Sequence, residues 1–252
     1  MVSVTVICLI YTSPRLADWV YESFRKFTPG AAFLFVANDP TPEVLSHLGQ
    51  WGYPFILNIN ERKSDDELFA AGFGKPEYMA RVYAGYNAGI MAAETEYVCL
   101  VNSDNYFSPG WLDGLCEHAG YGRIVTSTLV ERSHPKHAVF PGAVHGEFGG
   151  TPEQFNEAGF LALADDIRAD GITEGIAYMP ALVSRDVAIR AGLYPCGNLA
   201  GESFDQVTRY GDEAFFDRLK ALGVEHVTSL SSVVYHLKEG ERDDADCGGD
   251  EP

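Results

Sequence analysis

Short apolar runs alternate with amphipathic helical segments in the N-terminal part of the chain, and this alternation restricts the fold more than any other feature. Val2–Ile10, Ala32–Val36 and Tyr53–Ile59 have the length and composition of buried strands. Ser13-Pro14 and Thr41-Pro42 follow the first two runs, and each pairs an N-cap residue with proline at the first helical position. Strands joined by helices pair in parallel, so we expect an α/β fold with a mostly parallel central sheet flanked by helices.

The centre of the sequence places a polar cluster at the end of another buried strand. Tyr97–Val101 has the strand composition, Asn102-Ser103-Asp104-Asn105 follows it, and Ser108-Pro109 predicts a helix start. Ligands of open α/β sheets bind at the carboxyl ends of the strands, which is where this cluster lies. Carboxylate and amide oxygens suit Mg²⁺ or Mn²⁺, which share their coordination shell with substrate phosphates. The four residues are equally typical of a polar turn, and the cluster alone leaves both interpretations open.

A helix is predicted from Glu77 onward, because apolar residues recur there at helical spacing. They are Met79, Val82, Tyr83, Tyr86 and Ile90. Arg81 lies on the other side of this helix, where a guanidinium could reach a diphosphate or a base, or could simply face solvent. The remaining segments are assigned by composition. We expect Glu61–Gly74 to be a loop, Arg123–Val130 and Gly175–Leu182 to be strands, and Thr151–Ala169 to be a helix.

Two acidic residues begin a helix in the C-terminal part, and a histidine ends the last predicted strand. Asp212 and Glu213 precede an apolar helical stripe that Gly223 terminates. Acidic residues at a helix start are often only partners of the helix dipole. His236 follows the strand Val233–Tyr235, and a lone histidine is more often structural than a ligand. A zinc site is not expected at His134, His137 and His145, since no cysteine partner or helical spacing accompanies them.

Length and charge restrict the function classes. The 252 residues fit one domain, 1–238, followed by an acidic, glycine-bearing segment, 239–252, that we expect to be disordered. The net charge of −18 argues against strong nonspecific binding to nucleic acid or anionic lipid. We expect no transmembrane segment and no signal peptide, because the apolar runs are only strand-length and the N-terminus has no basic region. With an odd number of cysteines as well, a cytoplasmic location is expected.

One block of the sequence resembles a known family. The residues Asn87-x-Gly89-Ile90-x-x-Ala93-x-x-Glu96-Tyr97-Val98-x-Leu100-x-Asn102-x-Asp104, followed by Pro109-x-x-Leu112, resemble the central block of the family 2 glycosyltransferases. These are nucleotide-sugar enzymes of the GT-A fold. The resemblance extends with gaps from about Val2 to His236. It implies a Rossmann-like half at about 1–105 that binds the nucleotide sugar, and an acceptor-side half at about 106–238.

The resemblance also implies roles for individual residues. Asn102-Ser103-Asp104 corresponds to the Asp-x-Asp motif of the family, so Asp104 with His236 would hold Mn²⁺ or Mg²⁺, and Asn102 and Ser103 would contact the donor. The remaining donor contacts would come from the ends of the first two strands and from the helix after Glu77. They are Tyr11 and Thr12, either Asn38 or Asp39 for the base, and Arg81, which is chosen by its place on the helix, since the family often has its arginine directly before Asn87, where this chain has Tyr86.

The catalytic base is expected at Asp212 or Glu213. The family has a Glu-Asp pair whose second carboxylate is the general base, and here the order of the two residues is reversed. The first of two acids at a helix start tends to cap backbone N–H groups, and capping lowers the basicity of a carboxylate. We therefore expect Asp212 to cap the helix and Glu213 to accept the proton.

These observations predict a metal-dependent glycosyltransferase that moves a sugar from a UDP-, GDP- or dTDP-sugar to an unknown acceptor hydroxyl. The resemblance implies inversion, because most members of the family invert. Two alternatives stay open. Asn102 and the reversed acidic pair would also fit a non-catalytic module that only binds a nucleotide sugar. A sugar nucleotidyltransferase is less favoured, because such enzymes usually carry a glycine-rich loop after the first strand, where this chain has Tyr11-Thr12-Ser13-Pro14-Arg15.

Overall fold

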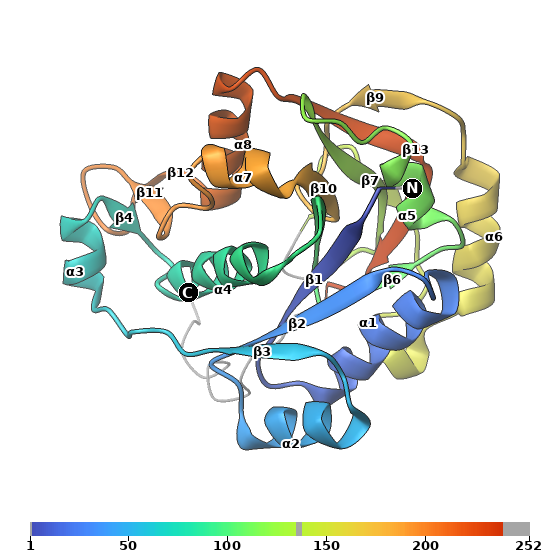
Figure 1. The fold of residues 1–252 in the computed structure, drawn as a ribbon, viewed down its shortest axis with the longest axis horizontal. Helices are drawn as coiled ribbons and strands as arrows, with labels where there is room; N and C mark the ends of the chain where they lie inside the picture. Colours follow the sequence, from blue (N-terminus) through green and yellow to red (C-terminus); the bar gives the residue numbers. More distant parts are fainter. Residues whose placement is uncertain (1, 135–137, 239–252) are drawn as a thin grey trace.

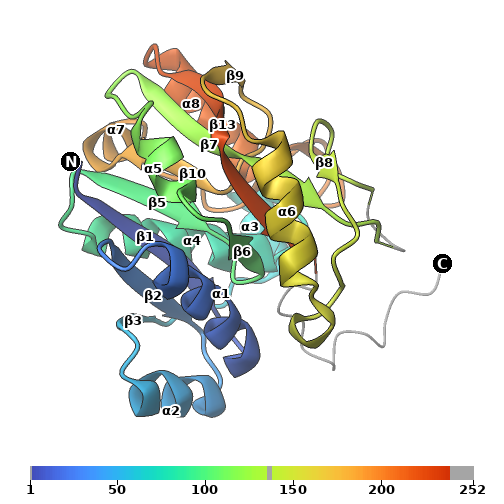
Figure 2. The same ribbon diagram turned by 90° about the vertical axis from the view of Figure 1, so that its right-hand side faces the viewer.

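A computed structural model describes residues 2–134 and 138–238, and the segment 239–252 and His137 lie outside these described residues. The architecture is a ten-stranded mixed sheet between two layers of helices (Figures 1 and 2). The main path of the sheet is β3 (Phe55–Asn58), β2 (Ala32–Asn38), β1 (Val4–Ile10), β5 (Tyr97–Val101), β10 (Ala181–Ser184), β7 (Arg123–Glu131), β13 (Glu225–His236) and β6 (Asn105–Phe107). Off this path, β8 (Val144–His145) pairs with β7 and β9 (Ile172–Glu174) pairs with β13.

Strand direction confirms the predicted parallel arrangement for the N-terminal half. The strands β3, β2, β1 and β5 are mutually parallel, whereas β10 is antiparallel to both of its neighbours. Only Asn102–Asp104 joins β5 to β6, yet β6 pairs with β13 near the opposite end of the order. The four steps from Val101 to Asn105 span at most about 14 Å. The sheet is therefore curled so that the ends of β5 and β13 approach each other.

Two hydrophobic clusters cover the two faces of the sheet. One cluster joins the sheet to α1 (Pro14–Phe27), α2 (Pro42–Trp51), α5 (Trp111–Cys116) and α6 (Glu157–Ile167). The other joins it to α4 (Tyr78–Ala92), α7 (Arg185–Arg190) and α8 (Gly211–Ala221). Ser13 and Thr41 cap α1 and α2 as predicted. Among the described helices, none is long and apolar enough to cross a membrane.

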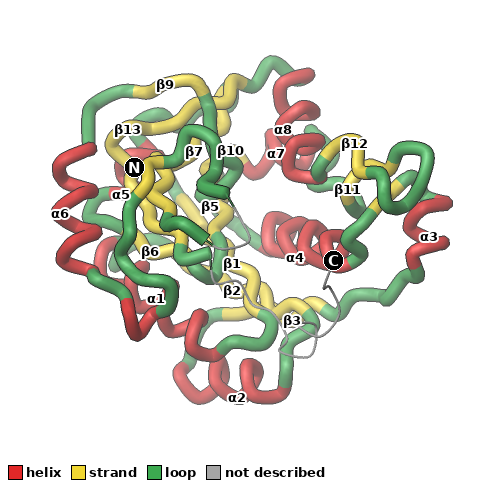
Figure 3. Tube along the Cα trace, turned by 180° about the vertical axis from the view of Figure 1, so that it is seen from behind, coloured by secondary structure: helices red, strands yellow, loops and turns green. Residues whose placement is uncertain are grey.

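A small second sheet connects the middle of the chain to its C-terminal part. Its order is β12 (Val207–Arg209), β11 (Asn198–Ala200) and β4 (Phe73–Gly74), and Figure 3 shows β11 and β12 on the same side of the molecule as α3 (Asp65–Ala70). The prediction of a loop at Glu61–Gly74 is wrong for most of its length, since α3 and β4 lie there. The missed signal is a capping box in which Ser64 and Glu67 exchange backbone and side-chain hydrogen bonds.

Three other predictions needed correction. Ser108 does not cap a helix, because its buried hydroxyl donates to the Val233 carbonyl at 2.7 Å and α5 begins after Gly110. The predicted helix Thr151–Ala169 is divided into η1 (Pro152–Gln154) and α6, and the Asn156 side chain caps α6. Of the expected strand Gly175–Leu182, only the last two residues are extended, as the start of β10.

Glycines bring α4 unusually close to the sheet. A Cβ atom on Gly89 would lie 2.5 Å from Ile7 Cγ2 and 3.0 Å from Val36 Cγ2. One on Gly85 would lie 2.9 Å from the Asn38 side chain. The backbone of α4 therefore contacts β1 and β2 directly, and the buried side chains of Tyr83, Tyr86 and Ile90 pack alongside, as the predicted stripe requires. This contact fixes how closely α4 approaches the sheet near the carboxyl ends of β1 and β2.

The same substitution should have opposite effects at two helical glycines. Gly89→Ala should lower the free energy of unfolding by about 1–3 kcal/mol, because the methyl group has no room against β1. Gly49→Ala in α2 should raise it by up to about 1 kcal/mol, because alanine favours helix and nothing lies within 4 Å of its Cβ. Urea denaturation of both variants measures this difference. Equal stability of Gly89→Ala and the wild type would show that α4 does not need the close approach.

Candidate functional site

The predicted metal pair meets at the curled edge of the sheet. Asp104, in the turn between β5 and β6, has an Oδ1 atom 3.3 Å from Nε2 of His236 at the end of β13. The backbone reinforces this contact, because Leu237 donates its N–H to the Asp104 carbonyl at 3.1 Å and Asn105 pairs with His236 across the two strands. The side chain of Asp104 is only 6% exposed. The pairing of β6 with β13, which was not predicted, is what brings the two residues together.

Glu131 is a member of this cluster that the sequence analysis missed. It is the last residue of β7, and its Oε1 lies 2.8 Å from His236 Nδ1. Its Oε2 lies 2.7 Å from Lys238 Nζ and accepts the Phe140 N–H at 2.7 Å. A carboxylate on the second imidazole nitrogen is the usual partner of a metal-binding histidine, since it fixes the ring and its tautomer. Its place at the end of a predicted strand could have identified Glu131, because parallel strands end at the same edge of the sheet, where ligands bind.

The charge on His236 depends on these two carboxylates. Burial by itself would lower the pKa of the imidazole, but Asp104 and Glu131 outweigh burial and raise the pKa to about 10. The same contacts act on Glu131: burial opposes ionisation of its carboxyl, and hydrogen bonds from His236, Lys238 and Phe140 lower its pKa below the ordinary value. The metal-free cluster therefore holds an imidazolium between two carboxylates.

The donor set fits a divalent cation that shares its shell with a phosphate. Asp104 offers a carboxylate oxygen and His236 an imidazole nitrogen whose ring is already oriented. Within residues 2–134 and 138–238, no group of three or more His, Cys, Asp or Glu side chains is gathered as a ready-made cation cage. Mn²⁺ and Mg²⁺ suit such a site, because they are commonly held by one or two protein ligands and completed by water and phosphate oxygens.

Asn102 and Ser103 complete the turn above Tyr86. The Tyr86 hydroxyl lies 3.1 Å from the Val101 carbonyl and 3.2 Å from Asn102 Oδ1, and the Asn102 N–H donates to Asn105 Oδ1 at 2.9 Å. Both Asn102 and Ser103 are partly exposed. The turn is thus fixed from below by α4 while its upper surface remains accessible.

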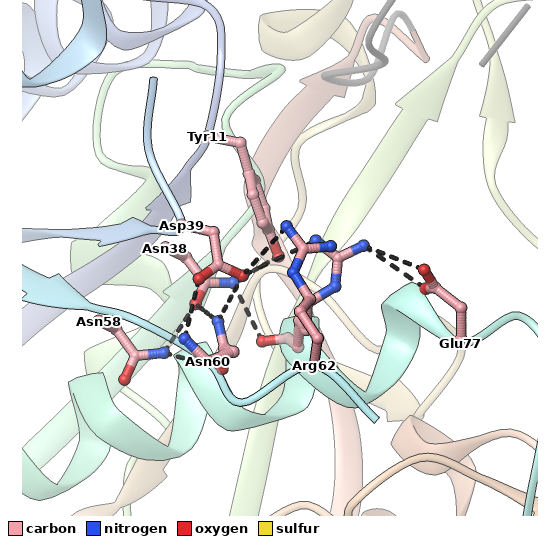
Figure 4. A network of polar contacts seen from close by, with 8 residues as sticks. Tyr11, Asn38, Asp39, Asn58, Asn60, Arg62 and Glu77 are labelled. Atoms are coloured by element: carbon pink, nitrogen blue, oxygen red, sulfur yellow. Dashed lines mark hydrogen bonds and ion pairs between the residues drawn. The ribbon is translucent and has the colours of Figure 1, made fainter. Parts of the chain in front are cut away.

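A second polar network lies at the ends of β1, β2 and β3 (Figure 4). Asn38 is fully buried at the end of β2, and its amide nitrogen donates to the Tyr11 hydroxyl at 2.6 Å and to the Arg81 carbonyl at 3.0 Å. Its Oδ1 accepts hydrogen bonds from Asn58 at 2.7 Å and from Asn60 at 2.8 Å. Every polar atom of the Asn38 side chain is therefore engaged in joining the strands to α4.

Asp39 is the next residue and lies at the rim of this network. Its carboxylate accepts the backbone N–H of Asn60 at 2.8 Å and the Asn60 side-chain amide at 2.9 Å. Arg81 Nη1 lies 3.7 Å from Asp39 Oδ2, and Arg62 Nη2 lies 4.0 Å from the same oxygen. The sequence left Asn38 and Asp39 open as the base-binding residue. Because Asn38 is buried and saturated, Asp39 is the better candidate.

A cavity of about 230 Å³ lies beside this network, between α4, the segment after β3 and the loop before β11. Its wall includes Asn60, Arg62, Arg81, Asn87 and Cys196. The Arg81 side chain is only 19% exposed, so the interpretation of Arg81 as part of a solvated helix face is wrong. Tyr11 belongs to the network and Thr12 follows it in the turn after β1. The structure thus gathers Tyr11, Asp39 and Arg81 at one end of the site.

The two acidic residues of α8 differ from expectation. Glu213 accepts the Tyr210 N–H at 3.1 Å, as the capping residue, and lies 3.6 Å from Arg209 Nη1. Asp212 accepts the Glu213 N–H at 3.0 Å, and burial raises the pKa of its carboxyl above the ordinary 3.8. The expectation that Asp212 alone caps the helix and leaves Glu213 free is therefore wrong. Both carboxylates accept a backbone N–H, so capping does not separate them, but Glu213 is paired with Arg209 and Asp212 is the residue whose burial raises its pKa.

A row of tyrosine rings connects the Asn102 turn to the start of α8. The rings of Tyr86 and Tyr194 lie 5.9 Å apart, and those of Tyr194 and Tyr83 lie 5.4 Å apart and nearly parallel. At one end of the row the Tyr86 hydroxyl lies 3.2 Å from Asn102 Oδ1, and at the other end the Tyr83 hydroxyl accepts the Gly211 N–H at 2.9 Å. The candidate metal pair and the candidate base thus border the same aromatic core.

No family model matches the chain, and no curated protein matches it. Solved structures do match. GalNAc-T7 with UDP, GalNAc and Mn²⁺ is 12% identical with a TM-score of 0.59, over 94% of this chain and 44% of that one. S. aureus TarS 1-349 is 12% identical with a TM-score of 0.55, over 93% and 60%. The mannosyltransferase PcManGT from Pyrobaculum calidifontis, in complex with GDP-Man and Mn²⁺, is 14% identical with a TM-score of 0.55, over 95% and 58%.

The chain therefore spans between 44% and 60% of the length of these three proteins. At identities of 12–14%, the match concerns the arrangement of helices and strands. The family 2 resemblance stays a prediction. The comparisons and the curled, mostly parallel sheet together show that this chain has the GT-A fold.

Proposed function

We propose that the chain is a metal-dependent glycosyltransferase that moves a sugar from a nucleotide-diphosphate sugar to an acceptor hydroxyl with inversion. The observation that carries this proposal is the contact of Asp104 with His236 at the curled edge of a GT-A sheet. The names of two structures that share the fold include Mn²⁺ with UDP or with GDP-Man, which supports a UDP- or GDP-sugar as donor.

The donor would lie along the carboxyl ends of β1, β2 and β5. Asp39 would accept a hydrogen bond from the base and Arg81 would donate one to it, with Tyr11 and Thr12 beside them. Asn102 and Ser103 border the path toward the metal pair. A cation held by Asp104 and His236 would neutralise the diphosphate as it leaves. Glu131 would keep the imidazole of His236 oriented.

The acceptor hydroxyl would lose its proton to Asp212. Burial raises the pKa of this carboxyl, whereas Glu213 is held by the Tyr210 N–H and by Arg209. A raised pKa makes Asp212 a stronger base than an ordinary aspartate, so it can take the proton of the hydroxyl that attacks the anomeric carbon. The opposing interpretation is a module that binds a nucleotide sugar without turnover. One observation favours it: residue 102, the first position of the Asp-x-Asp motif, is an asparagine, and its Oδ1 accepts a hydrogen bond from the Tyr86 hydroxyl.

Donor binding should require a divalent cation and should be lost in Asp104→Ala. The two carboxylates of the cluster only balance the charges of His236 and Lys238, so a cation held by Asp104 and His236 would supply the positive charge that binds the diphosphate. Calorimetry with UDP and GDP, each in Mn²⁺ or in EDTA, measures this dependence. Asp113→Ala, an exposed carboxylate on α5, is the control and should bind like the wild type. If each nucleotide bound as tightly in EDTA as in Mn²⁺, the metal would have to be removed from the proposal.

Glu131→Gln should lower the affinity for Mn²⁺ by about 10- to 100-fold, the usual cost of losing the carboxylate behind a metal-binding histidine. Electron paramagnetic resonance of free Mn²⁺ in the presence of UDP reports this affinity without any need for turnover. Glu147→Gln is the matched control, because its side chain is 55% exposed and contacts His145 instead. Unchanged Mn²⁺ binding in Glu131→Gln would mean that Glu131 is only a structural partner of Lys238.

Asp212→Asn should cut turnover by about 10²- to 10⁴-fold and leave donor affinity unchanged, which is the usual effect of removing a general base. Glu213→Gln should keep most of the turnover and lose about 1 kcal/mol of stability with its cap. Release of UDP, GDP or dTDP from the corresponding nucleotide sugars with Mn²⁺, with and without cell extract, measures turnover.

In the wild type, turnover should rise with pH as Asp212 deprotonates. The midpoint of this rise should lie above 3.8, the ordinary pKa of an aspartate, because burial raises the pKa of Asp212.

The opposite result, an active Asp212→Asn and an inactive Glu213→Gln, would transfer the role to Glu213. Donor binding without release of nucleotide from any of the donors would favour the non-catalytic module.

A further inference from the structure

Four segments of the chain meet in one buried hydrogen-bond cluster under the start of α8. The Tyr83 hydroxyl, on α4, donates to Asn198 Oδ1 on β11 at 3.0 Å. The backbone N–H of Gly211 is shared between the Tyr83 hydroxyl at 2.9 Å and Asn198 Oδ1 at 3.0 Å. Asn198 also donates its amide N–H to the Lys75 carbonyl at 3.0 Å. Tyr83 is 2% exposed and Asn198 is fully buried, so water does not compete for these bonds.

The cluster satisfies a backbone group that a helix itself leaves without a partner. The first N–H groups of an α-helix have no carbonyl to bind within the helix. Gly211 is the first residue of α8, and its N–H is directed at Tyr83 and Asn198. A Cβ atom on residue 211 would lie 2.2 Å from Tyr83 Cε2, so the tyrosine ring rests against the backbone itself.

Asp212 is the residue after this contact, so its place depends on where Gly211 is held. We infer that Tyr83 is a positioning residue: with Asn198, its hydroxyl fixes the first residue of α8 and thereby the carboxylate of Asp212. This inference rests on the proposed function, in which Asp212 accepts the proton of the acceptor. Under this inference α4 positions Asp212 through Tyr83 and also carries Arg81 at the edge of the cavity beside Asp39.

Tyr194 provides a matched control within the same aromatic row. Its ring stacks on that of Tyr83 at 5.4 Å and 5°, and it is buried to the same extent, at 2% exposed. Its hydroxyl, however, has no hydrogen-bond partner among the described residues. Tyr194→Phe therefore removes a hydroxyl that has no hydrogen-bond partner among the described residues, whereas Tyr83→Phe removes one that binds the first residue of α8. Removing an unsatisfied buried hydroxyl is close to neutral for stability.

The test compares Tyr83→Phe and Tyr194→Phe in two measurements. The first is hydrogen exchange of the backbone amides of residues 211–215, which reports the opening of the first turn of α8 without any substrate. We expect exchange about tenfold faster in Tyr83→Phe, and unchanged in Tyr194→Phe, because only the first variant removes one of the two acceptors of the Gly211 N–H and the hydroxyl that holds Asn198. Unchanged exchange in Tyr83→Phe would overturn the inference.

The second measurement is turnover of a UDP- or GDP-sugar with Mn²⁺, read as nucleotide release, together with calorimetry of UDP or GDP. Tyr83→Phe should lower kcat by about 10- to 100-fold, the cost of a misplaced catalytic group, with the donor KM and nucleotide Kd unchanged. Tyr194→Phe should keep the wild-type kcat. Faster exchange with a wild-type kcat in Tyr83→Phe would make Tyr83 purely structural and overturn the inference. No turnover in the wild type would instead contradict the proposed function, and the exchange measurement separates the two failures.

Discussion

The contact between the glycines of α4 and strands β1 and β2 is the constraint on which the rest of the site depends. Because Gly85 and Gly89 leave no side chain between helix and sheet, α4 lies low against the strand ends. The side chains that leave α4 at successive positions then reach three different places. Arg81 reaches the cavity beside Asp39, Tyr83 reaches the start of α8, and Tyr86 reaches the turn at Asn102. A helix held farther from the sheet could not contact all three.

Electrostatics explain how a chain of net charge −18 could bind the anionic donor that the proposed function requires. Buried carboxylates at Asp104 and Glu131 are compensated by His236 and Lys238, so the cluster is not a bare negative centre. Arg62 and Arg81 provide positive charge at the other end of the site, next to Asp39. Asp39, Asp104 and Glu131 thus each have a cationic partner nearby, and the proposed nucleotide diphosphate with its cation would replace part of this internal pairing.

Local patterns in the sequence predicted the local parts of the fold. Strand composition, the caps at Ser13 and Thr41 and the helical stripe of α4 depend on neighbours a few residues away, and the structure confirms them. Glu131 was missed because its place beside His236 arises from the pairing of β7 with β13, 105 residues apart in the sequence. The contacts of Asp212 and Glu213 were predicted incorrectly because the expectation took Asp212 as the cap, whereas the helix begins at Gly211 with Tyr210 as its N-cap and both carboxylates accept backbone N–H groups. The contact of Asp104 with His236 followed only from the family resemblance, since no local pattern indicates it.

The position of β13 in the chain has a consequence for the order in which the molecule is assembled. This strand pairs with β6, β7 and β9, and it contributes His236 to a cluster whose two carboxylates, Asp104 and Glu131, lie more than 100 residues earlier in the sequence. Closing so long a loop costs entropy before any contact is gained, so this pairing belongs to the late steps of folding. During synthesis on the ribosome, the polar network at the ends of β1, β2 and β3 can form while the contact of Asp104 with His236 is still missing. If the proposed function holds, the nascent chain would acquire its contacts for the nucleotide base before those for the diphosphate.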